Sequence, residues 1–166
     1  MRDNPDRGKG VVTPATVQLL EDADTLVLAA RRNMADFALH QYLAAVFDVV
    51  SKANRYFASH EPWKLAKTGP AEMRVVLFTT IEVLRIVAIL LQPIMPAAMS
   101  KLLDLLAVEP DRRNFDAVEV VEDFENFKGS EDLGRIAAPN RLRIGVRLPP
   151  PSPIFPRYVE DEAAAS

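Results

Sequence analysis

The sequence contains no cysteine and only 2 histidines, His40 and His60. Without cysteine the chain can form neither a disulfide framework nor a thiolate metal site. The two histidines stand about 20 positions apart and neither lies in an HExxH pattern, so a histidine-based zinc site is not expected. We therefore predict a chain that holds no metal.

The sequence patterns of common catalytic sites are also missing. There is no GxSxG, no P-loop and no GxGxxG, and the acidic residues are spread along the predicted exposed faces of helices. No pair of carboxylates stands out as a general acid and a general base. We expect no catalytic activity and no cofactor from this chain alone.

Charge and hydropathy exclude two further classes of protein. The net charge of -3 argues against a protein that coats nucleic acid by bulk attraction, although local contacts to a few nucleotides stay possible. Residues 1–10 are polar, which predicts no signal peptide. The most apolar stretch, 75–91, contains Glu82 and Arg85 and is shorter than the roughly 20 residues that span a bilayer. We expect a buried core helix, no membrane contact and a cytoplasmic location.

Hydrophobic residues make up 49% of the chain, and over the first two thirds they recur at helical spacing. Thr13-Pro14 is typical of a helix start, and Asp36 is expected to cap a second helix. The Glu61-Pro62 and Pro93–Pro96 breaks separate the later helices. The expected helices are 15–33, 37–58, a short turn at 63–67, 71–91 and 97–107. Short connections between long helices predict an all-α, antiparallel helix bundle.

The second and third long helices show different patterns. In the second, one apolar stripe is expected to face the core: Leu39, Leu43, Val46, Phe47, Val50, Ala53 and Phe57. The third is apolar nearly all round, which predicts a central position, with Glu82 and Arg85 paired three residues apart.

The chain divides into four predicted parts. Residues 1–12 are a flexible lead and 13–117 form the bundle. Residues 118–147 are an irregular connection, acidic at first and then basic. Residues 148–166 are a proline-rich closing segment and tail, extended because consecutive prolines fix the backbone and remove donors.

The single tryptophan, Trp63, directly follows the helix-breaking Pro62. One interpretation is a structural plug at the end of the bundle, because aromatic side chains usually serve packing. The other is a stacking platform: a ring held at a helix corner, near Arg55 and Lys64, can stack on an unpaired base. Asn54 likewise has two interpretations, a bond to a neighbouring helix or chain end, or a part of such a site.

Three segments carry a family resemblance: NRYFASHEPWKLAK, LLQPIMPAAMSKLLDLL and LPPPSPIFPRYVE. Together they resemble the anticodon-binding domain of bacterial methionyl-tRNA synthetases over about residues 13–117 and 148–160. The resemblance implies the bundle type that class I synthetases use for anticodon binding. It also implies two partners, methionine tRNA and a catalytic domain.

The resemblance assigns roles to individual positions. It implies that Trp63 stacks on an anticodon base, with Asn54 and Tyr56 shaping the site below it. Three cations beside this site are expected to contact phosphates: Arg55, Lys64 and Lys67. Pro93 and Pro96 match the break that orients the last bundle helix. Phe155 and Arg157 match the segment that folds back toward the catalytic domain.

Two departures from the family limit the expected function. The HIGH and KMSKS sequences for ATP and methionine chemistry are absent, so these ligands belong to a full-length ligase. The preceding helix, whose Asn and Arg read anticodon bases in the family, is also absent, which predicts weak tRNA binding with poor base specificity. The leading hypothesis is an anticodon-binding domain without its catalytic domain. The alternative is a helical protein-interaction module, or a gene remnant, that has lost tRNA binding.

Overall fold

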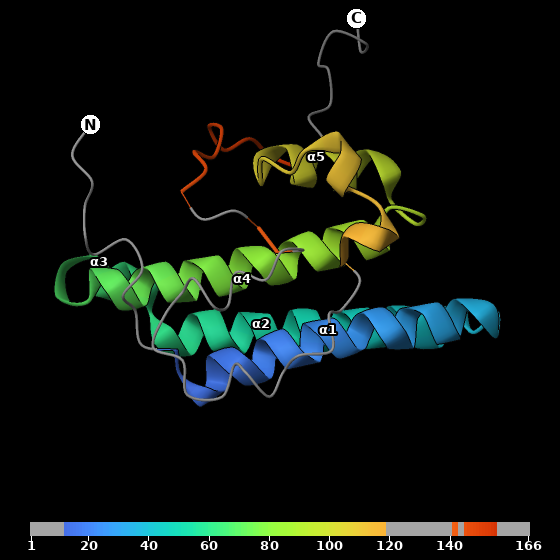
Figure 1. Ribbon diagram of the computed structural model, residues 1–166, viewed down its shortest axis with the longest axis horizontal. Helices are drawn as coiled ribbons and strands as arrows, with labels where there is room; N and C mark the ends of the chain where they lie inside the picture. The colour runs from blue at the N-terminus through green and yellow to red at the C-terminus, as the bar shows by residue number, and fades with distance from the viewer. Residues whose placement is uncertain (1–11, 119–140, 143–144, 156–166) are drawn as a thin grey trace, which may run out of the picture.

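The computed structural model describes residues 12–118, 141–142 and 145–155 (Figure 1). Every regular element within these ranges is helical, as the sequence predicts. The α-helices are α1 (Pro14–Ala35), α2 (Leu39–His60), α3 (Pro62–Thr68), α4 (Pro70–Leu91) and α5 (Pro96–Leu105), followed by the short 3-10 helices η1 (Pro110–Arg112) and η2 (Phe115–Val118). The predicted lead up to residue 11, the acidic part of the connection and Arg157 lie outside the described residues.

Proline stands at the first position of α1, α3, α4 and α5. Its fixed φ suits that position, and its missing N–H would have no partner there. Thr13 adds a side-chain cap to α1, because its Oγ1 accepts from the Thr16 N–H at 3.2 Å. The break between α4 and α5 falls at residues 92–95, between Leu91 and Pro96, as predicted.

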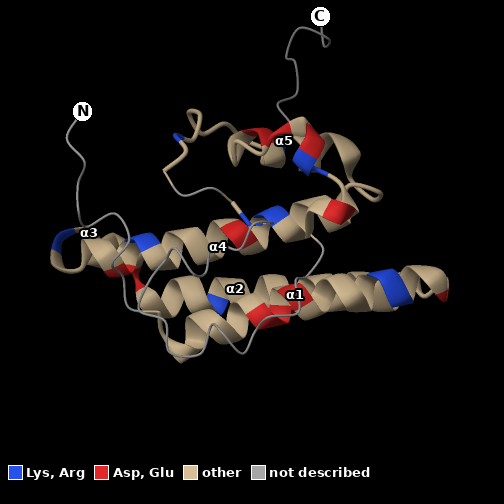
Figure 2. Cartoon of the chain, in the orientation of Figure 1, with Lys and Arg blue, Asp and Glu red and all other residues tan. Residues whose placement is uncertain are grey.

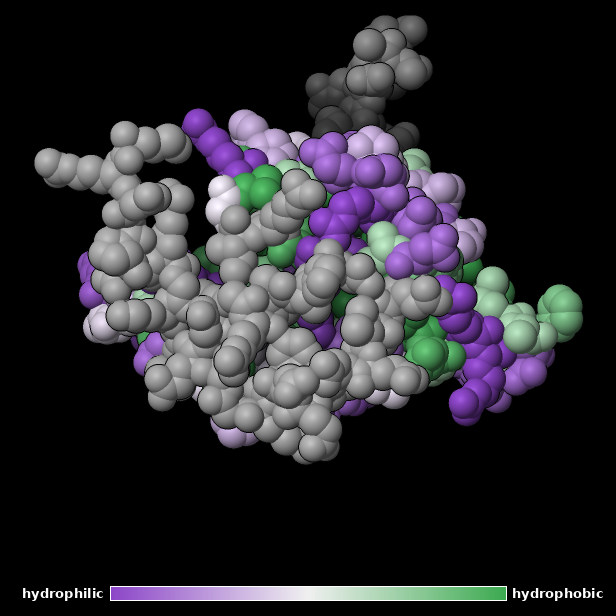
Figure 3. Space-filling model, viewed as in Figure 1, coloured by the Kyte–Doolittle hydropathy of each residue, from purple (hydrophilic) through white to green (hydrophobic). Residues whose placement is uncertain are grey.

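The expected cap at Asp36 is wrong. Asp36 ends α1, and its N–H donates to the Arg32 carbonyl, while Ala38 begins α2 without a side-chain cap. The reason is Phe37, whose φ of 56° reverses the chain between the two helices. Hydrophobic residues at this end of the α1–α2 hairpin are exposed (right-hand side of Figure 3), among them Met34 and Leu39.

Helix α4 is the centre of the fold. It packs against α1, α2, α3 and α5, and residues 85–91 are all buried. This confirms the central position expected from its apolar sequence. Antiparallel α1 and α2 lie along one side of α4, and α5 lies on the other (Figure 1).

The predicted core stripe of α2 is wrong in part. The residues that face α1 and α4 are Tyr42, Val46, Val49, Ala53 and Tyr56. Phe47 is 55% exposed instead. The two tyrosines can be buried because their hydroxyls have partners: Tyr42 donates to the Leu90 carbonyl, and Tyr56 shares a 2.8 Å hydrogen bond with Thr16 Oγ1.

Glu82 and Arg85 form the predicted pair, and both are buried in the middle of α4. Arg85 donates to both carboxylate oxygens, at 2.7 and 3.0 Å. The Leu142 N–H donates to Glu82 Oε2 at 3.0 Å, and Arg141 reaches Asp24 of α1. This buried charge cluster joins α1, α4 and residues 141–142, which follow the connection.

Candidate nucleic-acid interface

A single residue, Glu61, joins α2 to α3. Glu61 is the C-cap of α2 and the N-cap of α3, and its φ of 43° and ψ of 58° lie in the left-handed region. Its carbonyl accepts from the N–H groups of Lys64 at 2.8 Å and Leu65 at 3.3 Å. Pro62 is buried at the first position of α3. The corner therefore holds Trp63 in a fixed direction relative to α2.

Trp63 is 59% exposed, so it is not a buried plug. Its ring lies beside Phe57 of α2, with centroids 6.0 Å apart and planes tilted by 56°. Phe57 is partly buried against the core. This contact supports one part of the indole and leaves more than half of the side chain open to a ligand, as a base-stacking ring requires.

The contact between Phe57 and Trp63 was not predicted from the sequence, where Phe57 was expected only as part of the core stripe. The missed signal is the spacing: Phe57 stands one turn before the helix break and Trp63 directly after Pro62. When the chain turns at Glu61, the two rings come together across the corner.

The structure separates Tyr56 from the open site. Tyr56 is buried, its hydroxyl bonds to Thr16 at 2.8 Å, and burial raises the pKa of that hydroxyl above its ordinary value. His60 lies against the Tyr56 ring, with centroids 4.2 Å apart, and its Nδ1 lies 2.8 Å from the Tyr56 carbonyl oxygen. Tyr56 therefore holds the end of α2 in place.

The polar residues expected at the site are on the surface. Asn54 and Arg55 are exposed in the last two turns of α2, and Lys64 and Lys67 are exposed on α3. Lys64 forms an ion pair of 2.7 Å with Glu61, an exposed contact that contributes little to stability. The basic residues of α3 mark one end of the bundle (blue, left of Figure 2). This end combines an exposed aromatic ring with positively charged side chains.

Phe155, predicted to dock on a catalytic domain, is 69% exposed. A ring this open to solvent is available to another domain.

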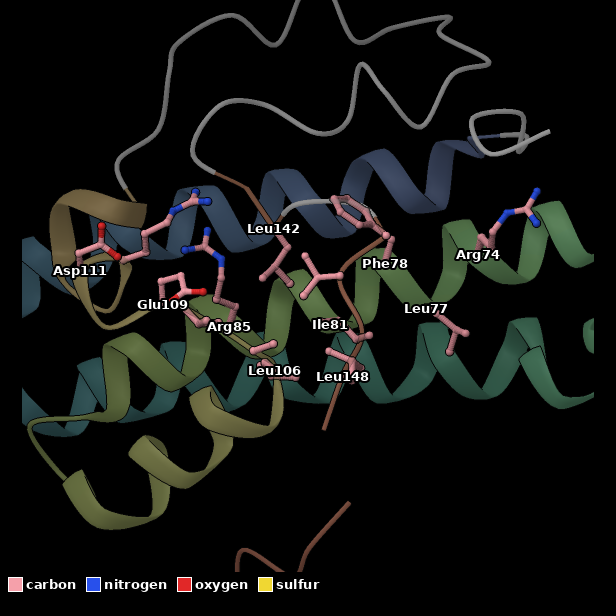
Figure 4. Close-up of a pocket in the computed structure, with 15 residues that line it drawn as sticks. Arg74, Leu77, Phe78, Ile81, Arg85, Leu106, Glu109, Asp111, Leu142 and Leu148 are labelled. Carbon is pink, nitrogen blue, oxygen red and sulfur yellow. The ribbon is translucent and has the colours of Figure 1, made fainter. Parts of the chain in front are cut away.

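An apolar groove runs along α4. Its volume is about 570 Å³, and Phe78, Ile81, Leu106 and Leu142 converge on it (Figure 4). Neither Trp63 nor any cation of α3 lines it. The exposed Trp63 ring and the groove are thus separate features.

Among the described residues, no group of three or more histidines or acidic residues could hold a metal ion. None of the described helices has the length and apolar character needed to span a bilayer.

Comparison with known proteins decides the family. The sequence profile described as "Anticodon binding domain of methionyl tRNA ligase" matches residues 6–132. The chain belongs to this family. Methionine–tRNA ligases of Brucella suis, Rhizobium meliloti and Mycobacterium leprae are 46%, 44% and 40% identical to the anticodon-binding domain described here, over 90–93% of the chain.

Solved structures agree with the family. The apo form of Mycobacterium tuberculosis methionyl-tRNA synthetase matches the domain with a TM-score of 0.75 and 36% identity, over 92% of this chain and 28% of that one. The same synthetase bound to methionyl-adenylate matches with a TM-score of 0.74 and 35% identity. The chain spans about a quarter of the length of the curated relatives it matches.

Proposed function

We propose that this anticodon-binding domain recognises methionine tRNA by stacking an anticodon base on Trp63. The observation that carries the proposal is the 59% exposure of the Trp63 ring, held between Pro62 and Phe57 at a one-residue corner. A ring that is already fixed loses little conformational freedom when a base stacks on it. Stacking of this kind contributes about 1–3 kcal/mol per base.

Phosphate contacts complete the proposed site. Arg55, Lys64 and Lys67 are exposed on the helices that meet at Glu61, where a bound loop would pass. Phosphate contacts position an RNA, while stacking on Trp63 and contacts from Asn54 act on its bases. Tyr56 takes part only by supporting the end of α2.

The division of the chain follows from this site. We propose that the bundle, 13–117, carries tRNA recognition and that 118–147 connects it to the closing segment, 148–166. Phe155 and Arg157 would dock on a catalytic domain that supplies the ATP and methionine chemistry of aminoacylation. Because this chemistry serves translation, we propose a cytoplasmic location.

Titration of the domain with the anticodon stem-loop of methionine tRNA tests the proposal. Trp63 is the only tryptophan in the chain, so its fluorescence reports one ring. We expect quenching on binding. The Trp63 variants have no tryptophan left, so their affinity is read from the anisotropy of a fluorescently labelled stem-loop, and Trp63→Ala should weaken binding by about 5- to 150-fold. Trp63→Phe should keep most of the affinity. Phe155→Ala is the matched control, since it removes an exposed ring elsewhere.

The salt dependence of binding separates the two kinds of contact. Lys67→Ala should reduce the slope of log affinity against log salt by about 0.7, because one phosphate contact is lost. Trp63→Ala should lower affinity at every salt concentration without changing that slope. Equal affinity of the wild type and Trp63→Ala would overturn the proposal.

A further inference from the structure

Two pairs of aromatic rings meet at the last turn of α2. In one pair, Phe57 supports the exposed Trp63 ring. In the other, the buried Tyr56 ring supports His60, with centroids 4.2 Å apart and planes tilted by 39°. His60 is the last residue of α2 and stands one turn after Phe57, so these two side chains are neighbours on the helix surface. The His60 ring therefore lies next to the proposed stacking site.

One nitrogen of the His60 ring is bound to the helix itself. Nδ1 lies 2.8 Å from the Tyr56 carbonyl oxygen and 3.2 Å from Ser59 Oγ. A carbonyl oxygen can only accept, so the hydrogen of the first contact is on Nδ1. The Ser59 hydroxyl donates its own hydrogen to the same carbonyl at 2.9 Å, and its oxygen can therefore accept from Nδ1. Both contacts favour the Nδ1–H form of the ring.

This hydrogen bond determines what the second nitrogen of His60 can do. A neutral imidazole has one N–H, and with that N–H on Nδ1 the Nε2 atom presents a lone pair and accepts. The two nitrogens point in divergent directions, so Nε2 is turned away from the Tyr56 carbonyl. The part of the chain that the structure describes forms no hydrogen bond to Nε2, and the side chain is partly exposed. His60 thus offers an acceptor to a ligand.

The cations around this corner have the opposite chemistry. Arg55, Lys64 and Lys67 carry only donors, which suit phosphate oxygens. The Nε2 lone pair requires a hydrogen on the ligand instead. A nucleotide provides one in two places, at the N–H groups of a base edge and at the ribose 2′-hydroxyl.

We propose that His60 Nε2 accepts a hydrogen bond from the RNA loop, beside the base that stacks on Trp63. This inference rests on the proposed function and adds selectivity to it. Stacking on a ring tolerates every base, because every base has a flat face. A fixed acceptor discriminates, because only a nucleotide with a hydrogen at that point satisfies it. The Tyr56 ring and carbonyl hold the acceptor in place before RNA binds.

Two amide substitutions separate the two nitrogens of His60. In His60→Asn the amide N–H takes the place of Nδ1 and can donate to the Tyr56 carbonyl, but nothing replaces Nε2. In His60→Gln the longer side chain carries its amide oxygen out to the position of Nε2. We expect His60→Asn to weaken binding of the anticodon stem-loop by about 2- to 10-fold and His60→Gln to stay within about twofold of the wild type. Both variants retain Trp63, whose fluorescence reports the titration.

The other histidine of the chain is the matched control. His40 is exposed near the start of the same helix, about 30 Å from His60 at 1.5 Å per residue. His40→Asn should bind like the wild type, and circular dichroism checks that each variant is folded. A purely structural role would harm His60→Gln more, because it loses the bond to the Tyr56 carbonyl. Wild-type affinity in His60→Asn, or a loss in His60→Gln as large as in His60→Asn, would overturn the proposal.

Altered stem-loops identify the donor. A 2′-deoxyribose at one loop position removes the ribose hydroxyl, and a base analogue that lacks one N–H group removes a base donor. One of these changes should lower the affinity of the wild type by about 2- to 10-fold. The same change should leave the affinity of His60→Asn unchanged, since this variant has no acceptor to lose. Equal losses in both proteins for every altered stem-loop would contradict the proposal.

Failure of this inference can be told apart from failure of the stacking proposal. Trp63→Ala tests stacking alone. A loss of affinity in Trp63→Ala with none in His60→Asn would leave stacking in place and remove the acceptor. Wild-type affinity in Trp63→Ala would overturn stacking and, with it, the placement of His60 beside a stacked base.

Discussion

Arg141 Nη2 lies 2.5 Å from Asp24 Oδ2, although the two residues are 117 positions apart in the sequence. Both side chains are nearly buried. Glu82 and Arg85 complete the group, with Arg141 Nη1 4.0 Å from Glu82 Oε1. Two carboxylates therefore face two guanidinium groups, and the group is neutral as a whole. Neutrality makes its burial tolerable, and it fastens residues 141–142 to the bundle.

Removing Arg141 should destabilise the fold. Arg141→Ala leaves Asp24 and Glu82 with Arg85 as their only guanidinium in this group. An uncompensated buried charge typically costs about 3 kcal/mol or more. Urea denaturation followed by circular dichroism measures the loss. Arg147→Ala, at an exposed position of the same basic segment, should change the free energy of unfolding by less than about 0.5 kcal/mol. Equal effects of the two changes would show that the contact to Asp24 contributes nothing.

Asp24 should also give the fold a pH dependence. Burial, stronger than the opposing attraction of Arg141, raises the pKa of the Asp24 carboxyl above its ordinary value of 3.8. The folded state then binds the proton more tightly than the unfolded state. The contribution of Asp24 to stability therefore falls as the pH rises from the ordinary pKa of the carboxyl through its raised pKa in the folded state. The free energy of unfolding of the wild type minus that of Asp24→Asn should therefore decrease from acidic to neutral pH, then level off. A difference that grows with pH would have the wrong sign.

Replacing Phe37 by glycine should stabilise the domain. Phe37 has a φ of 56° and is 95% exposed, and the Ala38 N–H donates to the Asn33 carbonyl across it at 2.8 Å. This is the helix-ending turn in which the left-handed residue is usually glycine. We expect Phe37→Gly to raise the free energy of unfolding by about 0.5–1 kcal/mol. Ala35→Gly, within the last turn of α1, should lower it by a similar amount. A loss of stability in Phe37→Gly would mean that the ring makes a contact in solution.

Tyr56→Phe tests whether the Tyr56 hydroxyl only stabilises the fold or also contacts RNA at the proposed site. The change removes the hydroxyl that bonds to Thr16 at 2.8 Å, so stability should fall by about 1 kcal/mol. Because Tyr56 is buried, the affinity of the folded protein for the anticodon stem-loop should change less than twofold. Thermal unfolding and fluorescence titration of the same sample give the two numbers. A large loss of affinity with unchanged stability would place the hydroxyl in contact with RNA.

Local sequence rules predicted much of this structure. Prolines at the starts of the helices located their boundaries, and the unbroken apolar pattern of 71–91 identified the central helix. The corner at Trp63 was also predictable, because Pro62 forces a break immediately before the ring.

Features that depend on contacts between residues far apart in the chain could not be predicted from the sequence. Periodicity placed Phe47 in the core stripe, and that stripe did not include Tyr42. In the structure Tyr42 is buried and Phe47 is exposed, and the Tyr42 hydroxyl donates to the Leu90 carbonyl across the bundle. Likewise nothing near Arg141 in the sequence indicates that it would reach Asp24.

The corner at Glu61 has a consequence for how this region can vary. With one residue serving as the end of α2 and the start of α3, no loop exists to absorb a change in length. One inserted residue would rotate α3 by about 100° relative to α2 and carry Trp63 away from Phe57. Among functional relatives, the six-residue interval between these two rings should therefore tolerate substitutions but neither insertions nor deletions.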